Sequence, residues 1–233
     1  MQKKIFIVLL VFVSTRWAFS QVTLFDDTFD FMGEWGYASG AWQIDNGILV
    51  QRDKNDHITH ICRKVKQSGI MEYAFDFVYL GGLEDNYGGF GIHICIDKPE
   101  GRRSWGMNHS YLLWLTYDIP AYRQPVFYAQ VYKSITPVKM DYWLMQTGTE
   151  FPLSPEILSP DFLQSTAVRG KKIHFRLVIN LNTGEGKFYN PADDSAYFPI
   201  EFGVPLTGGM YIALRTNSLS VGIDNFTVTR ISD

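Results

Sequence analysis

Hydrophobic and polar residues alternate along much of this chain. In the stretch 171–181 every odd position from Ile173 to Leu181 is apolar, and polar side chains occupy most positions between them. The stretch 71–79 repeats the pattern, with apolar or aromatic residues at all of its odd positions. Successive side chains of a β-strand point to opposite faces of its sheet, so this period of two predicts strands with one buried face.

Short segments of this kind recur along the chain and are separated by polar turns such as Asp45-Asn46-Gly47. Further strands are predicted over 41–50, 57–65, 90–97, 110–118, 126–133, 139–147, 208–215 and 218–230. No segment keeps the helical period of 3.6, and only 155–164 could hold a short helix. About a dozen strands without an internal repeat predict an all-β protein, a sandwich or a barrel.

The last predicted strand changes phase partway along. Its apolar residues stand at odd positions up to Ile223 and at even positions from Phe226. One extra residue at Asp224-Asn225 would produce this shift, which is the signature of a β-bulge. We therefore expect a bulge there, beside the N-terminal strand.

The first twenty residues differ from the rest. Lys3 and Lys4 precede nine consecutive apolar residues, and Ala18-Phe19-Ser20 fits a small-x-small cleavage site. This is the arrangement of a secretory signal peptide. We predict a signal peptide over 1–20 and a single domain over 21–233, exported to the periplasm or the extracellular space. The alternative is a retained membrane anchor, although a bilayer span needs roughly 20 apolar residues.

The balance of charge is mildly acidic. The chain has 21 Lys and Arg against 24 Asp and Glu, and losing the three positive residues of the signal leaves 18 against 24, a net charge of −6. The charges are spread without blocks. This balance gives no reason to expect nucleic acid or anionic lipid as a partner.

The chain has two cysteines, Cys62 and Cys95, and both lie in predicted strands. In an exported protein they could form one disulfide. They could equally be two small buried side chains.

Several short motifs resemble a known superfamily. They are Asp26-Asp27-Thr28-Phe29, Trp35, Trp42-Gln43-Ile44-Asp45-Asn46-Gly47, Gly88-Gly89-Phe90-Gly91-Ile92-His93-Ile94 and Gly222-Ile223-Asp224-Asn225-Phe226-Thr227-Val228. Together they resemble the concanavalin A-like lectin/glucanase superfamily, and within it bacterial laminin-G-like and 3-keto-disaccharide hydrolase-like domains. The resemblance implies a jelly-roll β-sandwich of two curved antiparallel sheets. It also implies a concave face that binds carbohydrate and, in some members, a structural calcium ion.

The catalytic motifs of the resembled enzymes are absent here. Glucanase members carry a Glu-x-Asp-x-x-Glu strand, whereas the nearest strand, 72–77, has a different spacing. The arginine and Tyr-Glu-x-Gln positions of the hydrolase-like domains correspond to His93 and to 111–114, which are mostly apolar. No catalytic residue is therefore carried over.

The remaining acidic and histidine pairs have poor geometry for catalysis. Glu72 and Asp76 would lie roughly 13 Å apart along a strand, while paired glycosidase carboxylates are about 5–9.5 Å apart. His57 and His60 would point to opposite faces of a strand, which does not favour a shared metal.

An aromatic and polar face is the best candidate for ligand binding. Tyr128, Gln130 and Tyr132 share one face of the 126–133 strand. Aromatic rings stack on the apolar faces of sugars, and amides bond to sugar hydroxyls. The other members expected on this concave surface are His93, Trp105, Trp114 and Trp143, with Trp105 on the loop 99–109. The alternative for each of these residues is core packing, which is where we place Trp35 and Trp42.

Carboxylates also gather where the first and last strands should pair. Asp26, Asp27 and Asp224, with Asn225, could converge there, and oxygen ligands of this kind suit calcium. The alternative is ordinary turn and bulge chemistry.

These observations favour a secreted bacterial carbohydrate-binding or surface-interaction module without catalysis. Loops 98–109 and 134–168 would lie near the rim of its concave face. One alternative is a glycoside hydrolase, which needs converging carboxylates or a carboxylate beside His93. The other is a structural role with an envelope protein partner.

Overall fold

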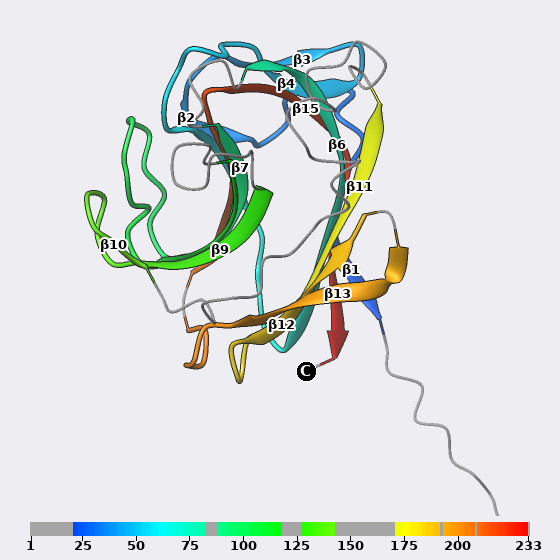
Figure 1. Ribbon diagram of the computed structural model, residues 1–233, viewed down its shortest axis with the longest axis vertical. Coiled ribbons are helices and arrows are strands. Elements are labelled where there is room, and N and C mark those ends of the chain that lie inside the picture. The colour runs from blue at the N-terminus through cyan, green and yellow to red at the C-terminus, as the bar shows by residue number, and fades with distance from the viewer. Residues whose placement is uncertain are drawn as a thin grey trace, which may run out of the picture.

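The computed structural model describes residues 21–82, 88–117, 127–142, 171–191, 193–207 and 209–232. Within these ranges the chain forms fifteen strands and no helix, arranged as two antiparallel sheets packed face to face (Figure 1). No helix in these ranges is long and apolar enough to cross a membrane. The predicted all-β sandwich is confirmed. The predicted signal peptide at 1–20 and helix at 155–164 lie outside the described residues.

Sheet A is built around its two longest strands, β6 and β15. Its order is β13-β12-β11-β6-β15-β4-β3, and β1 also pairs with β15. Its strands are β1 (Val22–Asp27), β3 (Trp42–Asp45), β4 (Ile48–Gln51), β6 (Ile70–Gly82), β11 (Lys172–Asn180), β12 (Glu185–Asn190), β13 (Asp193–Glu201) and β15 (Leu219–Ser232). The turn predicted at Asp45-Asn46-Gly47 is confirmed, because the segment 41–50 forms the β3–β4 hairpin and turns at Asn46 and Gly47, both with positive φ.

Sheet B is the more strongly curved sheet (Figure 1). Its order is β10-β9-β8-β7-β14-β5-β2. Its strands are β2 (Gly36–Ser39), β5 (Thr59–Lys64), β7 (Gly89–Ile96), β8 (Ser110–Tyr117), β9 (Phe127–Ser134), β10 (Met140–Tyr142) and β14 (Tyr211–Asn217). One face of sheet B packs on sheet A. The other, which we call the concave face, turns away from the core.

The predicted bulge in the last strand is confirmed. Asp224 of β15 pairs with Asp76 of β6, but the next paired residue, Thr227, faces Ala74. Three residues of β15 therefore span the distance that two residues span on β6. Asn225 takes the positive φ of 50°, a conformation that asparagine tolerates better than most residues. The same stretch of β15 pairs with β1, as expected.

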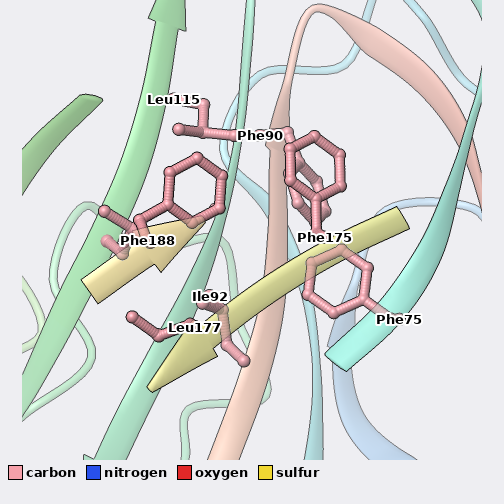
Figure 2. Close-up of a pocket in the computed structure, with 9 residues that line it drawn as sticks. Phe75, Phe90, Ile92, Leu115, Phe175, Leu177 and Phe188 are labelled. Carbon is pink, nitrogen blue, oxygen red and sulfur yellow. The ribbon is translucent and has the colours of Figure 1, made fainter. Parts of the chain in front are cut away.

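Phenylalanine rings hold the two sheets together. Phe75 of β6 has its ring centroid 5.5 Å from each of those of Phe90, Phe175 and Phe226. A small gap beside this cluster is lined by apolar residues of both sheets, with Phe188 across it (Figure 2). The volume of this cavity is about 10 Å³, roughly what one water molecule needs. It is an imperfection in core packing and cannot hold a sugar.

We expect Phe75→Ala to lower the free energy of unfolding by about 3–5 kcal/mol, because it removes a buried ring and leaves a cavity. Urea unfolding followed by tryptophan fluorescence measures the change. The control is Val138→Ala, at a side chain that is 81% exposed, for which we expect a change within about 0.5 kcal/mol. Equal effects of the two substitutions would contradict this account of the core.

Candidate functional site

Strand alternation divides sheet B into a core face and the concave face. On β7, Phe90 and Ile92 point into the core, so Gly91 and His93 face the concave side. The pairing registers then align one residue from each of five strands in a row across that face. From β9 to β5 the row is Gln130, Trp114, Gly91, Arg215 and His60.

The Trp114 indole lies flat against β7. A Cβ on Gly91 would come within 2.7 Å of the indole, and one on Gly89 would clash with it more severely. Glycine at both positions therefore leaves room for the ring to lie on the strand backbone. Trp114 remains partly exposed, so the sheet presents an aromatic surface supported from below by backbone.

The β9 residues continue this surface. Gln130 faces Trp114, and Tyr132 faces Leu112. The Tyr132 hydroxyl donates to Gln130 Oε1 at 2.7 Å, and both side chains are partly exposed. This part of the concave face therefore presents an amide and a phenol beside an indole, which is a suitable set of groups for contacting sugar rings and hydroxyls.

Arg215 lies in the same row and is buried, with only 3% of its surface exposed. Its guanidinium carbon is 5.4 Å from the centre of the Trp105 ring and 6.0 Å from that of Trp114. Its Nη1 donates to the Trp105 carbonyl oxygen at 2.6 Å and to His93 Nε2 at 3.2 Å. Burial lowers the pKa of Arg215 to about 10, so the group keeps its positive charge at neutral pH.

His93 and His60 are buried neighbours of this arginine. Because His93 Nε2 accepts from Arg215, its proton belongs on Nδ1, which donates to Ser110 Oγ at 3.1 Å. Burial, reinforced by the Arg215 charge, holds the pKa of His93 well below its ordinary value. Burial also lowers the pKa of His60, whose Nε2 donates to the Glu100 carbonyl oxygen at 2.7 Å. Both imidazoles are therefore neutral at pH 7.

The β7–β8 loop, residues 97–109, covers part of the concave face, and we call it the roof. Met107 packs there with Cys62, Ile96 and Ala213. The roof is tied to the β9–β10 hairpin, because both Ser104 Oγ and Gly106 N donate to the Pro137 carbonyl oxygen. Figure 1 shows this loop and the hairpin rising at the same end of sheet B. Trp105 stands at the edge of the roof with 49% of its surface exposed.

The structure thus brings four of the predicted ligand-binding residues together with Trp105 of the roof. His93, Trp114, Gln130 and Tyr132 lie on the concave face. Tyr128 belongs to the same strand, but its side chain is not among those described, and Trp143 lies outside the described residues. Arg215 and His60 are members that sequence reasoning missed.

Two of the three carboxylates predicted to bind calcium, those of Asp27 and Asp224, have other partners. Asp27 accepts from the Phe29 amide at 2.8 Å and from the Trp35 indole at 2.9 Å. Asp224 pairs with Lys172 and accepts from the Asn225 amide, and Asp26 pairs through its backbone with Thr227. Among the described residues no three His, Cys, Asp or Glu side chains form a group that could hold a metal ion. The observed contacts are those of turn and bulge chemistry.

The two cysteines are buried, and the two carboxylates of β6, Glu72 and Asp76, are paired with neighbouring side chains of sheet A. Cys62 and Cys95 are buried free thiols, and burial raises the pKa of each to about 12. Asp76 bonds to His174 and Asn225, and Glu72 pairs with Arg176. These carboxylates lie in sheet A, away from the concave face of sheet B.

The fold is a jelly-roll β-sandwich, as solved structures confirm. Over 92% of this chain and all of the other, it matches a lectin from Bauhinia forficata in complex with GalNAc, with 11% identity and a TM-score of 0.56. It matches a Bacillus subtilis protein of unknown function with a galectin-like fold over 88% of this chain and 94% of that one, at 13% identity and a TM-score of 0.52.

A third similar structure is the CBM2 module of the Lactobacillus casei BL23 phage J-1 evolved Dit. The match covers 91% of this chain and 97% of that one, at 9% identity and a TM-score of 0.53. No family model and no curated protein sequence matches the chain. At these identities the similarities establish the fold.

The buried histidines predict an acid-sensitive fold. Below pH 6.5, His93 and His60 bind protons in the unfolded chain but stay unprotonated in the folded chain, because their folded-state pKa values are lower. The free energy of unfolding therefore falls as pH decreases. Each histidine contributes a slope of at most about 1.4 kcal/mol per pH unit. We expect His93→Gln to remove one of the two contributions between pH 6.5 and 5, as measured by urea unfolding at a series of pH values. An unchanged slope would show that His93 is not buried in its neutral form.

Proposed function

We propose that this protein is an exported carbohydrate-binding module whose site is the concave face of sheet B. The observation that carries the proposal is the Trp114 indole, which lies flat on Gly89 and Gly91 and is partly exposed. An indole presented flat offers its π-face to the apolar side of a sugar ring, and its support by the backbone keeps it in place without a ligand.

Polar groups around the indole fit the same role. Gln130 and Tyr132 flank it on β9, and Arg215 and His93 follow it on β14 and β7. Sugar hydroxyls both donate and accept hydrogen bonds, so a site that combines an amide, a phenol and a guanidinium can bond several of them. Trp105 at the edge of the roof, half exposed, could contact the second face of the sugar.

The similar structures support this proposal at the level of fold. One is a lectin in complex with GalNAc and another is a CBM2 module. A shared fold does not transfer a ligand, because function belongs to the site. The proposal therefore depends on the concave residues of this chain. Export depends on the signal peptide predicted at 1–20, outside the described residues.

The proposal is for binding without catalysis. Hydrolysis would need two carboxylates, or one beside His93. The described groups that form hydrogen bonds with the His93 imidazole are Ser110 and Arg215, neither of which is a carboxylate. Release of reducing sugar from any glycan that the protein binds would overturn the non-catalytic part of the proposal and leave the binding part intact.

Replacement of Trp114 tests the proposed binding site. We expect Trp114→Ala to weaken binding of the best glycan found on an array by at least about 10-fold, since aromatic anchors dominate such sites. The affinity is measured by isothermal titration calorimetry. The matched control is Tyr197→Ala, an aromatic residue of β13 that is 44% exposed on the other sheet, for which affinity should not change. Binding that survives Trp114→Ala, or no glycan binding at all, would refute the proposed site.

A further inference from the structure

Arg215 is a buried cation whose described hydrogen-bond partners are neutral groups. Among the described residues it donates to a backbone carbonyl oxygen and to an unprotonated imidazole nitrogen. No carboxylate among the described residues pairs with it. A buried charge of this kind is costly unless an opposite charge compensates it. The concave face therefore contains a positive charge that the described part of the protein does not neutralise.

The described groups around Arg215 leave that charge uncompensated. His93 and His60 are neutral in their buried positions. Glu100 of the roof has other partners, because its carboxylate accepts from Asn108 Nδ2 at 2.6 Å and acts electrostatically on His60. Arg103 of the roof is paired with Asp56. Among the described residues, the charge that has no opposite charge beside it is therefore the Arg215 guanidinium.

This charge lies close to the Trp114 indole, on which we propose that the sugar stacks. The guanidinium lies near both indoles, with its carbon 5.4 Å from the ring centre of Trp105 and 6.0 Å from that of Trp114. A sugar stacked on Trp114 would bring its ring substituents towards Arg215, which is two strands away from β8 in the same row.

We propose that the glycan bound by this protein carries a carboxylate, and that Arg215 receives it. This inference rests on the proposed function and specifies its ligand class, an acidic sugar. A carboxylate oxygen takes the place of the Trp105 carbonyl oxygen as the acceptor for Arg215 Nη1. A charged acceptor forms a shorter and stronger bond to a guanidinium than a neutral carbonyl does, so the exchange favours the ligand.

Two further features fit a carboxylate. A single positive charge matches a group with one negative charge, and a planar guanidinium matches a planar carboxylate. The chain as a whole carries a formal net charge of −3. That charge disfavours nonspecific adsorption of polyanions, so binding of an acidic glycan would report a specific site.

The test compares each acid with its own neutral ester. The probe is an array of glycans containing glucuronate, galacturonate or sialate, each printed beside its methyl ester and beside neutral glycans. We expect the bound glycans to be acids, and esterification to weaken binding at least 10-fold. Equal binding of acid and ester, or binding confined to neutral glycans, would overturn this inference while leaving the proposed function standing. Binding to no glycan would refute the proposed function itself.

Substitution of Arg215 tests whether this residue causes the preference for the acid over its ester. Arg215→Met should weaken binding of the acid at least 10-fold more than binding of its ester, whereas Arg215→Lys should keep part of the preference for the acid. Urea unfolding establishes whether each variant folds. If Arg215→Met does not fold, the acid–ester comparison on the wild-type protein decides. A folded Arg215→Met variant that still prefers the acid would show that the carboxylate binds elsewhere.

Discussion

The structure depends on one constraint, which is that both faces of sheet B are covered at β7. All eight residues of this strand are buried. One face meets the phenylalanine cluster of sheet A, and the other meets Trp114 and the roof. Polar groups on the covered concave side must therefore satisfy one another, as His93 does with Ser110 and Arg215 with the Trp105 carbonyl. Glycine at 89 and 91 has the same origin, since no side chain fits between the backbone and the indole.

Most of the sandwich could be predicted from alternation along single strands. The odd-numbered apolar residues of 171–181 do line the core on β11, and the phase change at Asp224 does mark a bulge. The strand β13 was missed because its sequence, Asp193 to Glu201, mixes polar residues with Pro199 and carries no clean period of two. At the edge of a sheet such a strand needs only one partner, and here β12 provides it.

The candidate site was only partly predictable, because alternation assigns a residue to a face and does not identify its neighbours across strands. Tyr132, Gln130 and Trp114 could be recognised as aromatic or polar residues on one face. Arg215 carried no such signal, since it only begins the polar end of β14, Arg215-Thr216-Asn217, and reaches His93 and Trp105 through long-range pairing. The bulge at Cys95, with φ of 53°, also escaped prediction, and it brings Ile96 onto the concave side beneath Met107.

The fastening of the roof to the β9–β10 hairpin has a kinetic consequence. Trp105 covers the guanidinium, and Ser104 and Gly106 on either side of it are held by the same carbonyl oxygen of Pro137. The roof cannot lift from Arg215 without breaking those bonds or carrying the hairpin with it. If a ligand carboxylate binds Arg215 as we propose, the ligand has to wait for this opening on the way in and again on the way out. Such a wait would lower the association rate and lengthen the residence time.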